Sequence, residues 1–212
     1  MLEIIDGYKE YDGKIVLKNF SQKFKEGRIY ALVGPNGSGK TIVLKALTGY
    51  IKLTKGQVKQ DKNIIREKNN YIENAGIIIE TPNFISDFTV NENLEYLKKM
   101  SQNRDEINLL EWYKKFNMEE FVNKEFAKLS LGTKQKVGLI QAFMHNPKIY
   151  ILDEPFNSLD KKTIDILQKL LIEEKNKGKT IIITTHNNDE FIEKCDYQIH
   201  MFEGEKINLK KQ

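Results

Sequence analysis

A glycine-rich segment at residues 34–41 constrains this chain more than any other feature of its sequence. It fits the pattern G-x4-G-K-[ST] and lies directly between an apolar run typical of a buried strand, Ile29–Val33, and the start of a helical stretch. In such a loop the glycines let successive backbone N–H groups point into one concavity, and the N-terminus of the following helix adds partial positive charge. The segment therefore predicts a polyphosphate-binding loop. The other interpretation is a glycine-rich turn that ends in an ordinary surface lysine.

Two side chains of this loop carry specific chemistry. Lys40 would place an ammonium group against the outer phosphates, and the hydroxyl of Thr41 can ligate Mg²⁺. The residues predicted to bind the phosphates are Gly34, Pro35, Asn36, Gly37, Ser38, Gly39, Lys40 and Thr41.

Two adjacent carboxylates, Asp153 and Glu154, follow a second apolar run, Ile149–Leu152. This position is the carboxyl end of a predicted buried parallel strand, on the side of an α/β sheet where ligands bind. Asp153 would hold Mg²⁺ through its coordination shell, and Glu154 could accept a proton from, or orient, a water that attacks the γ-phosphate. The other interpretation is an acid pair that caps a helix before Pro155. Together with the loop, the pair predicts a nucleotide phosphate hydrolase or transferase.

Strand patterns and helix patterns alternate along the chain. The predicted strands are residues 2–8, 16–24, 29–33, 76–79, 149–152, 180–184 and 197–202. The predicted helices are residues 40–48, 105–116, 131–145, 161–177 and 189–194, with one more that starts after a capping box at Thr89 and Glu92. This alternation predicts an α/β fold in which helices cover a mainly parallel sheet.

The length and the order of these patterns predict how the chain is organised. A chain of 212 residues is expected to form one domain, since domains usually hold roughly 100–200 residues. Residues 81–145 show helical patterns and no clear strand, so we predict a helical subdomain inserted at that point. Residues 1–80 and 146–212 then form the core.

Composition excludes several classes of protein. No apolar run approaches the roughly 20 residues that a membrane-spanning helix needs, and the first residues lack the basic flank of a secretory signal. A single cysteine, Cys195, fits a reducing cytosol. The formal net charge is +4, with lysines and acids interspersed and no block of five or six like charges. This distribution favours a solvated surface and predicts no nucleic-acid partner.

Four further motifs narrow the function. Residues 129–136 combine Ser130, Gly132 and Gln135 ahead of a predicted helix, and an Asn-Ser-Leu-Asp run ends at Asp160. His186 follows the strand predicted at 180–184, and Tyr11 lies before a glycine turn. With these motifs in this order, the sequence resembles the ATPase subunits of ABC transporters over essentially its whole length.

The resemblance implies a P-loop NTPase fold of the ABC-ATPase type, with a RecA-like sheet core, an N-terminal antiparallel β subdomain and the inserted helical subdomain. It implies ATP and Mg²⁺ as cofactors and a second ATPase subunit, in a homodimer or a heterodimer. Ser130 and Gly132, with Gln135, would close on the partner's nucleotide, and Asp160 would contact the partner. His186 would sense the γ-phosphate. Tyr11 would stack on adenine, although Tyr8 is a rival for that role.

The resemblance also implies a transmembrane permease as partner and a location on the cytoplasmic face of the cell membrane. Four positions depart from the family pattern. Leu131 and Thr133 replace the commoner Gly and Gln of the signature, and Ile42, a further member of the nucleotide-binding set, brings no second hydroxyl. Glu80 replaces the glutamine that usually links Mg²⁺ to the transmembrane interface. Its carboxylate would either strengthen the attachment of the metal or need a compensating lysine.

The segment around Glu80 is similar to the branch that exports bacitracin-like and lantibiotic peptides. We therefore expect an ATP-hydrolysing subunit that drives a separate permease, exporting an antimicrobial peptide or related hydrophobic compound. Two alternatives stay open: a soluble ABC-type switch that acts on ribosomes or DNA, and a nucleotide-dependent regulator that no longer hydrolyses ATP. Three apolar residues near Glu80 form either subdomain packing or a groove for a cytoplasmic helix of a membrane partner: Phe84, Ile85 and Phe88.

Overall fold

A computed structural model gives the structure of the protein and describes residues 1–67, 70–186 and 190–207. Within those residues the strands form two sheets. The first is antiparallel, in the order β2-β1-β4-β5. Its strands are β1 (Leu2–Tyr11), β2 (Lys14–Phe24), β4 (Lys55–Gln60) and β5 (Asn63–Ile65).

The second sheet is mainly parallel, in the order β10-β9-β3-β8-β7-β6. Only the edge strand β10 runs antiparallel to its neighbour. Its strands are β3 (Ile29–Val33), β6 (Ala75–Ile78), β7 (Ile149–Leu152), β8 (Thr180–Thr185), β9 (Tyr197–Phe202) and β10 (Glu205–Ile207). The predicted parallel sheet is therefore confirmed.

The central strands are apolar at nearly every position because both faces of this sheet are covered. In β3, Ile29 and Val33 pack on one side, whereas Tyr30 and Leu32 pack on the other. The two core clusters lie on opposite sides of the sheet, since successive side chains of a strand point to opposite faces. Parallel pairing then brings the carboxyl ends of β3, β7 and β8 to one edge.

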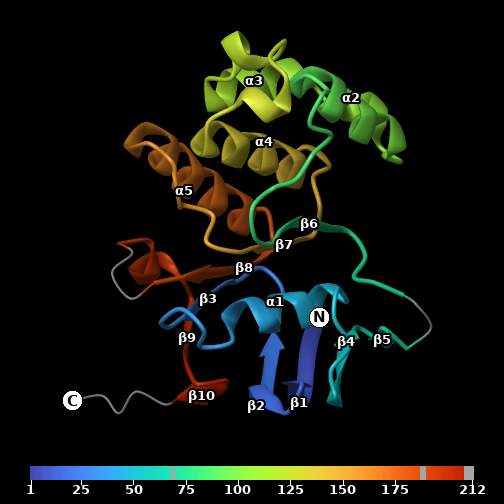
Figure 1. The fold of residues 1–212 in the computed structure, drawn as a ribbon, viewed down its shortest axis with the longest axis vertical. Helices are drawn as coiled ribbons and strands as arrows, with labels where there is room; N and C mark the ends of the chain where they lie inside the picture. The colour runs from blue at the N-terminus through green and yellow to red at the C-terminus, as the bar shows by residue number, and fades with distance from the viewer. Residues whose placement is uncertain (68–69, 187–189, 208–212) are drawn as a thin grey trace.

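Helices form the layers on both sides of the parallel sheet (Figure 1). The α-helices are α1 (Lys40–Thr48), α2 (Val90–Met100), α3 (Leu109–Phe116), α4 (Leu131–Met144) and α5 (Lys161–Asn176). Short 3₁₀ helices cover Arg104–Glu106, Glu119–Phe121, Phe126–Lys128 and Glu190–Lys194. Helix α1 lies between the two sheets, and α4 and α5 cover the other face, with α2 and α3 beyond them.

The structure corrects several predicted elements. Strands β4, β5 and β10 were missed. The helix predicted at 105–116 is broken, because Asn108 caps a shorter α3 by accepting the amide N–H of Glu111 at 3.4 Å. The final short helix is a 3₁₀ turn that begins at Glu190, and position 189 lies outside the described residues. The predicted capping box at Thr89 and Glu92 is present at the start of α2.

Candidate nucleotide site

The loop between β3 and α1 depends on its glycines. Gly37 and Gly39 have φ angles of 78° and 101°, a left-handed region that favours glycine. At Gly34 an added Cβ would lie 2.3 Å from the carbonyl oxygen of Met201, so a side chain does not fit there. These positions fix the backbone of the predicted phosphate loop.

Lys40 folds back onto this loop. Its Nζ donates hydrogen bonds to the carbonyl oxygens of Gly34 at 2.7 Å and Pro35 at 3.1 Å. Burial lowers the pKa of the Lys40 ammonium, while the carboxylates of Glu154 and Asp153 act in the opposite direction. The cation is therefore held inside the loop, where an anionic phosphate would compensate for its lost hydration.

A second observation indicates a polar ligand at this loop. Within the described residues, the buried hydroxyl of Ser38 has no hydrogen-bond partner. Buried polar groups are nearly always paired, so an orphan of this kind fits a site that a ligand completes. The loop opens onto a cavity of about 600 Å³, which is lined by residues 36–42, the start of β2, Glu154 and Gly204.

The loop and the acid pair are joined directly. The Thr41 hydroxyl donates to Asp153 Oδ2 at 2.9 Å. Thr184, at the end of the neighbouring strand β8, donates its hydroxyl to Asp153 Oδ1 at 2.5 Å and accepts the backbone N–H of Glu154 at 2.8 Å. This role of Thr184 was missed in the sequence, where the only signal was a threonine pair just before His186.

Both carboxylate oxygens of Glu154 have neighbours. His186 Nε2 lies 3.2 Å from Oε1, and the side-chain amide of Asn157 donates to Oε2. The Glu154 backbone has a φ of 45°, in the left-handed region that non-glycine residues rarely adopt. The predicted proton acceptor and the predicted γ-phosphate sensor are thus in contact, with Asn157 as a third member that sequence reasoning missed.

The donor set around Thr41 suits Mg²⁺. A hydroxyl and a carboxylate are hard oxygen ligands, and Mg²⁺ usually takes one or two such protein ligands and completes its shell with waters and phosphate oxygens. In the described ranges no cluster of three or more His, Cys, Asp or Glu side chains could hold a metal by itself.

The predicted signature residues lie apart from the loop cavity. Ser130 caps α4 by accepting the amide N–H of Thr133 at 3.2 Å, and its hydroxyl is exposed. An added Cβ at Gly132 would lie 2.3 Å from the Ser158 carbonyl oxygen. Gln135 is buried and donates to the Pro155 carbonyl oxygen at 3.4 Å. None of the three lines the loop cavity, although Gln135 lines a smaller cavity together with Asp153 and Glu154.

Two other predicted residues also lie outside the loop cavity. Asp160 caps α5, where it accepts the amide N–H of Thr163 at 2.8 Å, and it forms an ion pair with Lys136 at 3.1 Å. Tyr11 ends β1, is 42% exposed, and carries the Lys9 ammonium 4.4 Å from its ring centroid. Its stacking on adenine stays a prediction.

Glu80 follows β6 and has a φ of 61°. Its Oε1 accepts a bond from Lys45 Nζ at 2.5 Å. Of the two outcomes left open for this carboxylate, the structure presents a compensating lysine.

Comparisons with known proteins agree with this geometry. A family profile described as ABC transporter matches residues 17–157. The chain is 34% identical over 216 residues to the uncharacterized ABC transporter ATP-binding protein YybJ of Bacillus subtilis, across 100% of this chain and 99% of that protein. It is 31% identical to the lantibiotic transport ATP-binding protein SrtF of Streptococcus pyogenes, across 100% and 91%. It is also 33% identical to the spermidine/putrescine import ATP-binding protein PotA of Thermotoga maritima, across 95% and 56%.

Solved structures show the same fold. A dimeric structure of MJ0796, a bacterial ABC transporter cassette, matches with a TM-score of 0.86 and 27% identity, across 98% of this chain and 97% of that one. A post-hydrolysis state of that cassette, bound to ADP and Pi, matches with a TM-score of 0.83 and 25% identity, across 100% of both chains.

The chain belongs to the ABC transporter family, and within it to the ATP-binding subunits, which are ATPases. The ABC-ATPase fold expected from the motifs is confirmed. In the part of the chain that the structure describes, no helix has the length and apolar character needed to span a membrane.

Proposed function

We propose that this ATPase drives export of an antimicrobial peptide or related hydrophobic compound through a separate membrane permease. The observation that carries the ATPase chemistry is the 2.9 Å bond from Thr41 to Asp153, which joins the phosphate loop to the acid pair. The cargo class is supported by the match to SrtF, which extends over 91% of that transport protein, whereas the match to the importer PotA covers 56% of it.

The chemistry proposed for the site follows from its side chains. Lys40 leaves the carbonyl oxygens of its own loop and binds the outer phosphates of ATP. Thr41 and Asp153 would hold Mg²⁺, which would supply positive charge to neutralise the phosphate oxygens. Glu154 accepts a proton from the attacking water or orients that water. His186, next to the Glu154 carboxylate, senses the γ-phosphate.

A second ATPase subunit is part of this proposal. Ser130 is exposed at the N-terminus of α4, where free amide groups and the helix dipole favour an anion. Because Ser130 and Gly132 line no part of the loop cavity of their own chain, the proposed role for them is to close on the nucleotide of a facing copy or a related subunit. Asp160 is placed by the same proposal at the contact between the two subunits.

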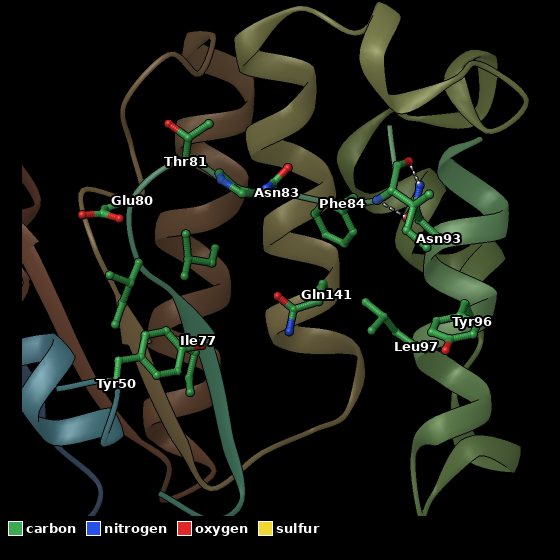
Figure 2. A pocket seen from close by; sticks show the side chains of 14 residues that line it. Tyr50, Ile77, Glu80, Thr81, Asn83, Phe84, Asn93, Tyr96, Leu97 and Gln141 are labelled. Atoms are coloured by element: carbon green, nitrogen blue, oxygen red, sulfur yellow. Dashed lines mark hydrogen bonds between the residues drawn. The ribbon is translucent and has the colours of Figure 1, made fainter. Parts of the chain in front are cut away.

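The proposed permease contact is a groove of about 620 Å³ beside Glu80 (Figure 2). Its lining is mostly apolar and aromatic, and Figure 2 shows Tyr50 and Ile77 on one side facing Leu97 and Tyr96 of α2 on the other. Tyr50 and Tyr96 are 55% and 54% exposed. An open groove with this lining fits an amphipathic helix that inserts its apolar face.

The three apolar residues near Glu80 do not all serve the same purpose: one packs within the helical subdomain, and another lines the groove proposed for a permease helix. Phe84 is half-buried against Phe126, with ring centroids 5.0 Å apart, so it supports the packing of the helical layers. Ile85 lines the groove and is 46% exposed, whereas Phe88 is exposed outside the groove lining. We propose that a cytoplasmic helix of the permease covers Ile85, which would hold the chain at the cytoplasmic face of the membrane.

The proposal is tested in the native host. Deleting the gene is expected to raise sensitivity to lantibiotic-type peptides, and the wild-type chain should restore resistance. Glu154→Gln should fail to restore it, whereas the matched surface variant Glu173→Gln should succeed. The tagged chain should co-purify with a permease from membranes. Co-purification with ribosomes or DNA would instead support the soluble switch, and absence of ATP turnover with the permease present would support the regulator.

A further inference from the structure

Glu80 lies at the boundary of two cavities. It lines the groove of about 620 Å³ described above, and it also lines a smaller cavity of about 260 Å³ together with Asp153 and Glu154. Its side chain is 65% exposed. One carboxylate therefore borders both the proposed permease contact and the acid pair of the nucleotide site.

A third carboxylate in this position creates an electrostatic conflict. Asp153 and Glu154 already bring negative charge to the small cavity, and the proposed substrate is a triphosphate. Like charges at short range repel one another, and this electrostatic repulsion becomes stronger as water is excluded from the site. An uncompensated Glu80 would therefore weaken binding of the nucleotide.

Lys45 supplies the opposite charge. Its Nζ lies 2.5 Å from Glu80 Oε1, and its side chain is 24% exposed, so much of the cation is shielded from solvent. Lys45 lies one helical turn after Thr41 on α1, and residues at this spacing share one face of a helix. The helix that begins at the phosphate loop is thereby tied to the segment that forms one wall of the groove.

We propose that Lys45 is a positioning residue that makes Glu80 compatible with nucleotide binding. The two side chains act as a neutral unit. Lys45 cancels the carboxylate charge and holds Oε1, while Oε2 carries no hydrogen bond within the described residues and stays available to the small cavity. This inference rests on the proposed function in one respect, since it assumes that nucleotide binds at residues 34–41.

An ordinary surface ion pair would behave differently. Such pairs usually contribute little to folding because solvent screens them. The proposed unit acts on ligand affinity instead, so its two residues must be coupled. Loss of Lys45 should weaken nucleotide binding only while Glu80 carries its negative charge.

The experiment is a double-mutant cycle on the full chain, read out as the dissociation constant of ADP in excess Mg²⁺ by isothermal titration calorimetry. Lys45→Met is expected to weaken binding about tenfold, and Lys45→Arg, which keeps the charge, should retain most of the affinity. In the Glu80→Gln background, Lys45→Met should cause no further loss. The matched control is Lys128→Met, which removes an exposed pair with Glu125 at 2.9 Å and should leave binding unchanged.

Thermal unfolding of every variant verifies that each one is folded before its affinity is interpreted. An equal loss from Lys45→Met in both backgrounds would overturn the inference, because Lys45 would then act independently of Glu80. Unchanged affinity in Lys45→Met alone would overturn it too. A wild-type chain that binds no ADP would refute the nucleotide site itself, a result distinct from either of these.

Discussion

Replacing Thr184 by valine tests how the acid pair is held. Thr184 is fully buried in β8, and its hydroxyl donates to Asp153 Oδ1 while accepting the backbone N–H of Glu154 at 2.8 Å. Valine keeps nearly the same shape and removes the hydroxyl. Thr184→Val therefore isolates the two hydrogen bonds without leaving a cavity.

The expected cost follows from those two bonds. A hydrogen bond to a charged group contributes about 1.5–3 kcal/mol, and an unpaired buried N–H costs about 1–3 kcal/mol. The Glu154 N–H is only partly buried and the two effects are not additive, so we expect a loss of about 2–3 kcal/mol in the free energy of unfolding. For a chain of this size that loss lowers Tm by roughly 5–10 °C.

The same change should reduce ATP turnover by at least about tenfold, because Asp153 and Glu154 lose the group that fixes both of them. Affinity for ADP without Mg²⁺ should be kept, since Lys40 and its loop are untouched. The matched control is Ile183→Val on the same strand, which costs about 0.5–1.5 kcal/mol and should leave turnover unchanged. Calorimetry and a steady-state ATPase assay measure both effects. Wild-type stability or wild-type turnover in Thr184→Val would show that the Thr184 hydroxyl does not hold Asp153 and Glu154 in place.

Three further changes give distinct outcomes. Gly132→Ala should lower the unfolding free energy by about 1–3 kcal/mol in denaturant titrations, because its Cβ would lie 2.3 Å from the Ser158 carbonyl oxygen. Asp160→Ala should cost about 1 kcal/mol through the lost cap of α5. The Asp160 pKa is lowered from 3.8 to about 2, chiefly by the backbone N–H that it accepts, so its stabilisation is complete above about pH 4. The Tm difference from wild type should shrink as the pH falls from about 4 to about 2, and a constant difference would contradict this. Lys40→Ala should abolish measurable ATP binding with the fold intact. Retained affinity for ATP would contradict the assignment of residues 34–41 as the phosphate-binding loop.

The features predicted best from the sequence are those set by neighbouring residues. The loop at residues 34–41 was recognisable because its glycines, its lysine and the flanking patterns all lie within one short stretch. The cap at Thr89 follows the same logic, since a capping residue bonds a backbone amide only a few positions along the chain. Strand β3 is apolar throughout because both faces are covered, which its composition reveals.

The features that were missed depend on contacts between distant parts of the chain. Strand β4 is mostly polar, with Val58 as its only buried residue, and it is held by pairing with β1. The bond from Thr184 to Asp153 exists because β7 and β8 are neighbours in the sheet, which no local pattern shows. The ion pair between Lys45 and Glu80 joins helix α1 to the segment after β6. The sequence therefore indicated that Glu80 could need a compensating lysine but did not identify Lys45 as that lysine.

Dimerisation around the nucleotide is tested by the mass of Glu154→Gln with and without ATP and Mg²⁺, measured by size-exclusion chromatography with light scattering. We expect a chain of 24.8 kDa without nucleotide and a stable species of twice that mass with ATP. Adding Ser130→Arg, at the exposed start of α4, should return the protein to the lower mass while ATP still binds. A variant that binds ATP yet stays at the lower mass would contradict a nucleotide site completed by a second subunit.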